Sequence, residues 1–138
     1  MTGLIVLAIA VAATLAIGFY RRATDGRARA EAPGDQTPRL NSTRIGHELG
    51  AAATFVQFSS ATCAPCRSTR SVLSGLAAEQ PDVAHVELDA ESRLDLVEEF
   101  AIARTPTVLV LDATGAIRHR IVGAPRKPQL MDVLQTMR

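Results

Sequence analysis

The run from Gly3 to Tyr20 limits the possible folds of this chain more than any other feature, because its 18 residues include no charged side chain. As a helix it would extend about 27 Å, close to the hydrocarbon thickness of a lipid bilayer. Phe19 and Tyr20 fall at one end, where aromatic rings favour the headgroup region. We therefore expect residues 1–20 to form one transmembrane helix that anchors the chain.

Two other interpretations of this run are open. A cleaved signal peptide normally carries positive charge before its apolar run, and Met1 and Thr2 supply none beyond the amino terminus. Its cleavage site should follow the run directly, whereas the small-residue pattern at residues 28–30 comes later and lies among charges. A buried helix of a soluble protein is the other interpretation, but a domain this small has little room for a helix that is apolar all round.

The composition changes abruptly after Tyr20. Arginine, alanine, glycine, proline and acidic residues alternate without apolar periodicity, which predicts a flexible linker over residues 21–43. The stretch from Leu40 to Gly50 fits either a short helix or a strand and loop. Residues 44–138 are enough for one compact domain that buries a core without disulfide bonds.

Charge and cysteine content exclude several classes of protein. The net charge is +1, and the chain has one Tyr, four Phe and no Trp, so neither a basic stripe nor aromatic stacking predicts a nucleic-acid partner. Two cysteines are too few for a disulfide-rich scaffold. Because Cys63 and Cys66 are three positions apart, a bond between them closes too small a loop to stabilise the fold. The pair therefore serves chemistry or a metal.

Apolar periodicity predicts strands that alternate with helices. The predicted elements are a strand at 53–59, a helix from Cys66 that ends before Pro81, a strand at 83–88, a helix at 94–101, strands at 107–111 and 116–122 joined by a turn, and a final amphipathic helix carrying Leu130, Val133, Leu134 and Met137. Alternation favours parallel pairing, and the closing hairpin adds an antiparallel edge. The expected fold is α/β, a mixed central sheet with helices on both faces.

The sequence Cys63-Ala64-Pro65-Cys66 directly follows a predicted strand and opens a helix. At a helix N-terminus, unpaired N–H groups and the helix dipole favour an anion, so Cys63 would become a reactive thiolate. Pro65 suits the first helical turn, where its missing N–H has no cost. Cys66 lies within disulfide reach and can attack a mixed disulfide formed at Cys63.

Two alternatives for this pair are a structural zinc site and inert core cysteines. Zinc requires four ligands, and no second cysteine pair exists. His47, His85 and His119 are widely separated. A Cys-x-Pro-Cys that opens a helix would be an unusual place for inert cysteines. We expect no metal and no cofactor.

Four segments resemble landmarks of the thioredoxin family, in the family's order, between Ala53 and Met137. They are TFVQFSSATCAPCRSTRSVLSGLA, VAHVELDAES, RTPTVLVLDATG and IVGAPRKPQLMDVL. The resemblance implies a thioredoxin-like fold in which Cys63 attacks and Cys66 resolves. It also implies that Thr105 and a cis Pro106 pack against the disulfide and present backbone to substrate, and that Gly123 matches the family's glycine beside this site.

The chain departs from the thioredoxin pattern at several positions. Thr62 and Ala64 replace the usual Trp and Gly around the first cysteine. Gln57 replaces a buried acid, and His85 stands where a Lys is often found. Because an amide cannot titrate, the Cys66 proton must go to water, to substrate or to His85. These features resemble the membrane-tethered thioredoxin-like proteins of bacteria.

The resemblance implies a thiol–disulfide oxidoreductase that reduces protein disulfides near the membrane, with a reductase or a membrane dithiol carrier as electron donor. An extracytoplasmic oxidase or isomerase, and a redox-gated binding or sensor module without turnover, remain alternatives, because the same motif supports them. Arginines at positions 21, 22, 27 and 29 follow the anchor, which predicts a single-pass protein of the cell membrane whose domain faces the cytoplasm.

Overall fold

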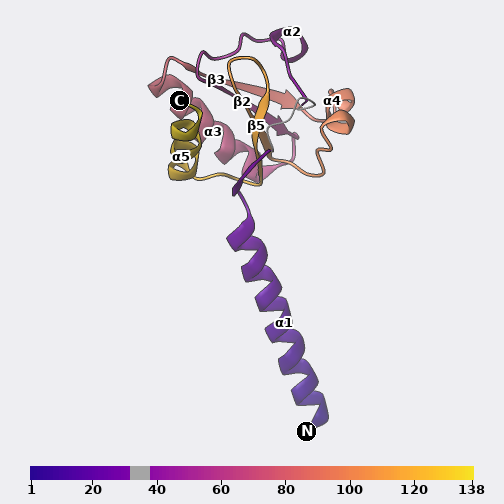
Figure 1. The fold of residues 1–138 in the computed structure, drawn as a ribbon. Helices are drawn as coiled ribbons and strands as arrows, with labels where there is room; N and C mark the ends of the chain where they lie inside the picture. The colour runs from indigo at the N-terminus through magenta and orange to yellow at the C-terminus, as the bar shows by residue number, and fades with distance from the viewer. Residues whose placement is uncertain (32–37) are drawn as a thin grey trace.

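The central strand of the fold is β2 (Ala53–Ser59), all seven residues of which are buried. The structure is a computed structural model that describes residues 1–31 and 38–138. The other elements are α1 (Thr2–Thr24), β1 (Ala28–Ala30), α2 (Ser42–Ile45), α3 (Ala64–Glu79), β3 (Val83–Asp89), α4 (Leu94–Glu99), β4 (Thr107–Leu111), β5 (Ile117–Val122) and α5 (Lys127–Met137). In Figure 1, α1 projects from one end of the α/β domain.

The strands form one mixed sheet in the order β1-β5-β4-β2-β3. Within the described residues, β2 and β3 are the one parallel pair, whereas β4 is antiparallel to β2 and β5 is antiparallel to both β4 and β1. The predicted α/β fold with a mixed sheet is confirmed. Parallel pairing, however, is limited to one pair of strands, because the chain after α4 enters the sheet on the other side of β2 in the opposite direction.

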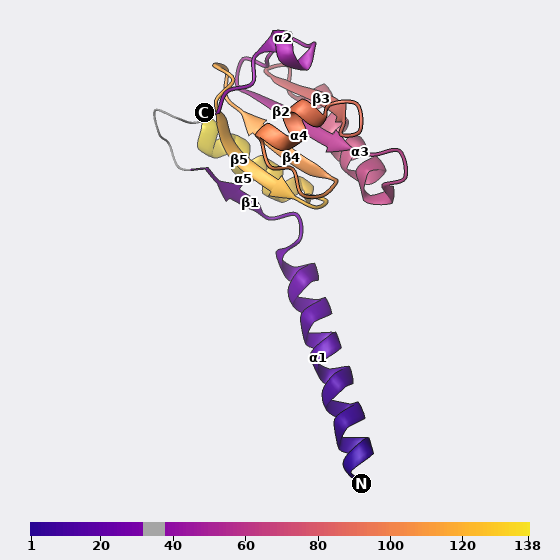
Figure 2. The same ribbon diagram turned by 90° about the vertical axis from the view of Figure 1, so that its right-hand side faces the viewer.

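Helices cover both faces of the sheet, so the core has two layers. Figure 2 shows α4 in front of the sheet and α3 and α5 behind it. One layer packs Leu96 and Phe100 against Val56 and Phe58. The other packs the α3 and α5 side chains against Phe55 and its neighbours in the sheet; its larger members are Leu73, Leu76, Val108, Val110, Ile121, Leu130, Val133 and Leu134. Alternate residues of β2 therefore face different helices, as strand geometry requires.

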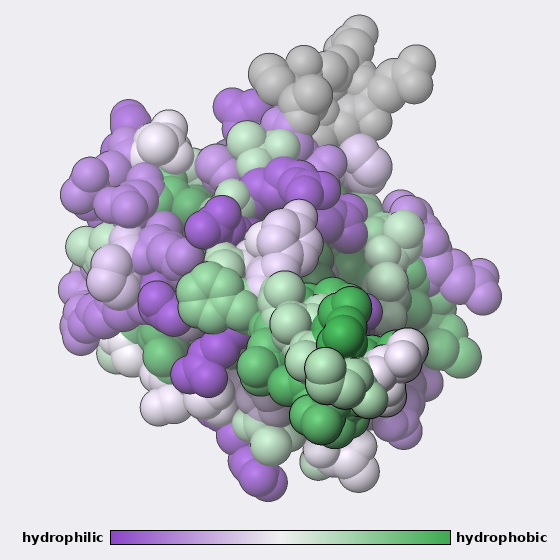
Figure 3. All heavy atoms as spheres, turned by 90° about the horizontal axis from the view of Figure 1, so that it is seen from below, coloured by the Kyte–Doolittle hydropathy of each residue, from purple (hydrophilic) through white to green (hydrophobic). Residues whose placement is uncertain are grey.

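Helix α1 is the one helix in the described part of the chain that is long and apolar enough to cross a membrane, and none of its residues is buried. A signal sequence near the N-terminus can also be this long and this apolar. The helix continues four residues past the predicted end at Tyr20, and Arg21 and Arg22 lie in its last turn. In Figure 3, which looks at the domain from the α1 side, the apolar helix stands out in green against a face with many hydrophilic residues.

The prediction of an irregular linker over residues 21–43 is wrong for Ala28–Ala30, which form β1 and pair with β5. The physical reason is that backbone hydrogen bonds and the residues on either side of β1 hold it against β5, and these leave no apolar pattern in the sequence. The Gly26 amide donates to the Val122 carbonyl at 2.8 Å, and Arg120 donates to Glu31 at 2.9 Å. The linker also ends early, at the short helix α2. Its residues 32–37 lie outside the described part of the chain.

Candidate active site

The two cysteines lie at the start of α3, directly after the loop that leaves β2. Cys63 is the N-cap residue of α3, in an extended conformation, and Pro65 occupies the first helical turn. Cys63 and Cys66 form a disulfide with their Cα atoms 5.3 Å apart. The helix begins here because Cys63 has an extended conformation, as N-cap residues do. Pro65 fits the first turn because N–H groups there have no partner within the helix. Both cysteines thus lie in the loop and first turn that follow β2.

The environments of the two cysteines differ. Cys66 is 1% exposed, whereas Cys63 is only half-buried. The N-cap position places the Cys63 side chain beside the unpaired N–H groups of the first turn of α3, which favour its thiolate. The pair thus consists of one accessible sulfur in a field that stabilises negative charge and one sulfur behind it.

The loop that leads into β4 lies beside the disulfide loop. The Thr105–Pro106 peptide bond is cis, and Pro106 is buried. A hydrogen bond of 3.3 Å joins the Ser60 and Thr105 hydroxyl groups across the two loops. The Gly123 amide donates to the Pro106 carbonyl at 2.8 Å. The structure therefore gathers the predicted substrate-binding residues at one end of the sheet, where β2 ends, β4 begins and β5 ends.

Gln57 is fully buried and all of its polar atoms have partners. Its Nε2 donates to the Cys66 carbonyl and to the Ser59 hydroxyl, both at 2.9 Å. Its Oε1 lies 3.0 Å from Nε2 of His85, and Nδ1 of His85 lies 3.1 Å from the Ser74 hydroxyl. Since Oε1 can only accept, Nε2 of His85 carries the proton in the neutral ring and Nδ1 accepts from Ser74. A continuous polar chain thus connects the domain surface with the backbone of Cys66.

Burial lowers the pKa of His85 below its ordinary value of 6.5, opposed by the nearby Glu87 carboxylate and assisted by Arg70. The pKa of Glu87 is also lowered, mainly by its hydrogen bond with Arg70. Arg70 binds this carboxylate through two nitrogens, at 2.5 and 2.8 Å. His85 is therefore neutral at pH 7, in the tautomer that Gln57 requires. Gln57 and His85 are in direct contact, and their link to Cys66 runs through its carbonyl oxygen.

Sequence reasoning did not identify two residues beside this site, Asp25 and Arg104. Arg104 donates to the Asp25 carboxylate, and a methyl group added at Gly123 would collide with that carboxylate. The signal was weak, because an aspartate in a linker indicates only solubility. His47 is exposed, and His119 lies on β5 opposite β1, so neither joins the site. Over residues 1–31 and 38–138, no group of three or more His, Cys, Asp or Glu side chains is placed to hold a metal.

Comparisons with known proteins agree with this geometry. The thioredoxin family model matches residues 43–136. A thioredoxin from Chlamydia muridarum is 31% identical over 95 residues, covering 69% of this chain and 92% of that protein. An H-type thioredoxin from Fagopyrum esculentum is 34% identical over 76 residues. The match covers 55% of this chain and 64% of that protein.

The fold similarity leads to the same family. The crystal structure of a thioredoxin from Nicotiana alata superposes with a TM-score of 0.56 and 28% identity, covering 64% of this chain and 75% of that one. A thioredoxin mutant from Halobacterium salinarum gives the same TM-score at 22% identity, over 62% of this chain and 74% of that one, and supports the fold alone. Because the family match extends over well more than half of its residues, this chain belongs to the thioredoxin family.

Proposed function

We propose that this chain is a membrane-anchored thiol–disulfide oxidoreductase that reduces disulfides of proteins close to the membrane. The observation that carries the proposal is the unequal exposure of the two cysteines, half-buried Cys63 at the N-terminus of α3 and 1% exposed Cys66. A substrate can reach the first sulfur, but the second reacts only with a group already bonded to the first. In this assignment residues 1–20 are the anchor and residues 44–138 the catalytic domain.

The reaction proceeds in two exchanges. The Cys63 thiolate attacks one sulfur of a substrate disulfide, forms a mixed disulfide and releases the other substrate sulfur as a thiolate. Cys66, after losing its proton, then attacks the Cys63 sulfur and releases the second substrate thiol. The substrate gains two electrons, and the chain is left with the Cys63–Cys66 disulfide. A reductase or a membrane dithiol carrier must return two electrons before the next cycle.

The substrate chain would lie along the loop of Thr105 and Pro106. This loop is joined to the disulfide loop by the bond between Ser60 and Thr105, so a peptide there has its disulfide beside Cys63. Gly123 holds this loop through its amide, which donates to the Pro106 carbonyl, and a side chain at this position would collide with the Asp25 carboxylate. Thr105, Pro106 and Gly123 are therefore the proposed substrate-binding residues.

Trapping of the mixed disulfide tests the proposal. The Cys66→Ser variant cannot complete the second exchange, so we expect it to accumulate substrate bonded to Cys63. The matched Cys63→Ser variant should accumulate none, because its remaining sulfur is buried. Non-reducing electrophoresis measures both after exposure to insulin, and equal trapping by the two variants would contradict the assigned roles.

The direction of the reaction depends on the reduction potential of the pair. Reduction is proposed because the arginines after α1 favour a cytoplasmic domain, and the cytoplasm keeps thiols reduced. Equilibration of the Cys63–Cys66 pair with glutathione buffers measures this potential. A potential near that of thioredoxin, about −270 mV, supports a reductant, whereas one near that of the oxidant DsbA, about −120 mV, would favour the oxidase alternative.

A further inference from the structure

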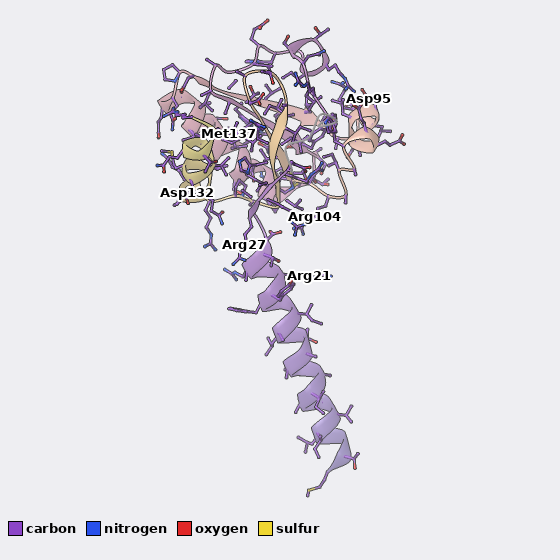
Figure 4. All side chains as sticks on the ribbon, viewed as in Figure 1. Arg21, Arg27, Asp95, Arg104, Asp132 and Met137 are labelled. Carbon is purple, nitrogen blue, oxygen red and sulfur yellow. A yellow bond between two sulfur atoms is a disulfide. The ribbon has the colours of Figure 1, made fainter. Side chains whose placement is uncertain are left out.

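Four arginines gather where α1 meets the domain. Arg21 and Arg22 come from the last turn of α1, Arg104 from the loop before Pro106, and Arg126 from the residue before α5. They line one cavity of about 350 Å³ together with Asp25 and Ala124. We call these four residues the arginine cluster. Figure 4 shows Arg104 and Arg27 on the face of the domain from which α1 emerges, with Arg21 just below them.

The arginine cluster carries an excess of positive charge. Four guanidinium groups surround one carboxylate, that of Asp25, which leaves a net charge of +3. The carboxylate is paired with Arg104. Among the described residues, Arg21, Arg22 and Arg126 form no salt bridge, which is also true of Arg27, Arg29, Arg39 and Arg67 outside the cluster. The cluster is therefore complementary to a group with several negative oxygens, and guanidinium groups bind phosphate in bidentate geometry.

The length of α1 indicates where such a group would come from. The uncharged segment of α1 matches the hydrocarbon thickness, so the next two residues, Arg21 and Arg22, fall at the level of the lipid phosphates. Arg104 and Arg126 line the same cavity and therefore lie at that level too. The amino end of α5, which begins at Lys127, adds the partial positive charge of its dipole to this face.

The same face carries the active site. Strand register places Phe58 opposite Thr107 and Thr107 opposite Val122, and the Gly26 amide bonds the Val122 carbonyl. Three strand spacings of about 4.8 Å therefore separate the end of β2, where the disulfide loop starts, from the point where the chain enters from α1. A surface that binds the arginine cluster therefore also fixes the orientation of Cys63 relative to that surface.

We propose that the arginine cluster binds the phosphate groups of anionic lipids and holds the active-site face of the domain against the membrane surface. This inference rests on the proposed function, in particular on α1 as a membrane anchor. It narrows the substrate class to proteins whose disulfides lie close to the membrane surface. The short connection between α1 and β1 supports this arrangement. It starts at Asp25, and the Gly26 amide already bonds to β5, so the domain is held close to the end of α1.

Distances from two labelled positions to the lipid headgroups test the inference. The full chain, with Cys63→Ser and Cys66→Ser, receives one donor dye at Ala61→Cys beside the active site or at Ala51→Cys before β2. These positions lie at opposite ends of β2, about 20 Å apart. The chain is reconstituted into vesicles of phosphatidylcholine alone or with phosphatidylglycerol, each with an acceptor on the headgroups. We expect more energy transfer from position 61 than from position 51 in the anionic vesicles.

The arginine cluster should account for this difference. Each arginine near an anionic surface contributes roughly a five-fold change in binding, so Arg104→Gln with Arg126→Gln should reduce the docked-to-undocked ratio about 25-fold. The control removes equal charge from the far end of the domain through Arg44→Gln and Arg118→Gln, and should retain the difference. Equal transfer from positions 61 and 51, no effect of phosphatidylglycerol, or no effect of the cluster variant would each overturn the inference.

A separate readout distinguishes this inference from the proposed function. The Cys66→Ser chain in neutral detergent should trap insulin through Cys63 whether or not lipid is present. Trapping without lipid-dependent energy transfer overturns lipid binding alone. Loss of trapping in detergent overturns the proposed redox function instead.

Discussion

His85 is held neutral in the folded chain, and this has a consequence for stability. Because burial lowers its pKa below 6.5, the folded state binds fewer protons than the unfolded state between that lowered pKa and 6.5. The free energy of unfolding therefore rises with pH through this window. The contribution of neutral His85 is fully present above pH 6.5 and is lost as the pH falls through the lowered pKa. We predict that the Tm falls on acidification below 6.5 and that His85→Gln flattens this dependence.

Two other groups have to be separated from this effect. The pKa of His119 is also lowered, by burial and by Arg118, so it contributes with the same sign. His119→Gln is therefore the matched control and should remove only its own share. The pKa of Glu87 is lowered from 4.5, so its contribution is lost at more acidic pH. If wild type and His85→Gln show the same pH dependence of Tm between pH 5 and 7, the His85 ring is not buried as its bonds to Gln57 and Ser74 require.

Gln57 occupies the position from which a carboxylate could serve the second exchange. Its amide bonds the Cys66 carbonyl but cannot accept a proton. In the Gln57→Glu variant, burial would raise the pKa of the new carboxyl group toward neutrality and make it a general base. We predict that Cys66 then resolves the mixed disulfide about ten-fold faster or more, with a new titration in the pH–rate profile.

Stopped-flow measurement of mixed-disulfide resolution from about pH 5 to 9 tests this prediction. Gln57→Met has similar volume and no titrating group, so it reports the loss of the hydrogen bonds alone. His85→Gln shows whether the imidazole takes any part. Superimposable profiles for wild type, Gln57→Glu and His85→Gln would assign the proton transfer to solvent or substrate.

Individual residues of the site differ in how far the sequence reveals them. Gln57 stands out as a polar residue in a buried strand, and a buried amide must find partners, so a hydrogen-bonded amide could be expected, whereas its partners, the Cys66 carbonyl and His85, follow only from the fold. Asp25 could not be found this way. Its role near Gly123 depends on Arg104, which is 79 positions away in the chain. Such pairing follows from tertiary structure and leaves no local pattern.

Strand β1 is an entire element that the local sequence does not reveal. Ala28-Arg29-Ala30 has neither β-branched residues nor a usable alternation, and β propensity depends strongly on context. It becomes a strand because β5 offers a free edge and Gly26 directs the chain toward it. The longer strands, by contrast, are evident from their apolar runs, and α3 from its spacing and from Pro81 after its end. The helix predicted at 94–101 is shorter: α4 ends at Glu99, Leu96 is its buried residue, and Leu94 is 61% exposed.

Gly26 is the residue on which the docking of β1 depends. Its φ is +74°, and an added methyl group would collide with the Ala124 carbonyl. We predict that Gly26→Ala releases residues 25–31 from β5, at a cost of about 1–3 kcal/mol in local stability. Loss of hydrogen-exchange protection at the amides that pair β1 with β5 measures this release.

Gly46→Ala is the matched control for this change. Gly46 has nearly the same φ, +68°, but nothing lies within 4 Å of an added methyl group. It therefore carries the backbone strain without the collision and should leave β1 protected. Equal protection of β1 in both variants would show that the contact with Ala124 does not hold this segment.

The orientation of the whole molecule depends on the charges on either side of α1. Arg21, Arg22, Arg27 and Arg29 follow the helix within the distance that counts for the positive-inside rule. Acidic residues weigh little in this rule, so Asp25 does not cancel them. The arginine cluster adds to the preference, since anionic lipids give the cytoplasmic leaflet its negative surface potential.

We predict that the domain faces the cytoplasm. Alkaline phosphatase needs disulfides and folds only outside this compartment, so a fusion after Arg138 should be inactive, whereas a fluorescent protein that folds in the cytoplasm should be bright. Changing the arginines at positions 21, 22, 27 and 29 to glutamine should weaken the preference and raise phosphatase activity. Strong phosphatase activity of the unmodified fusion would reverse the topology. The Cys63–Cys66 pair would then work in an oxidising compartment, and the oxidase or isomerase direction would follow.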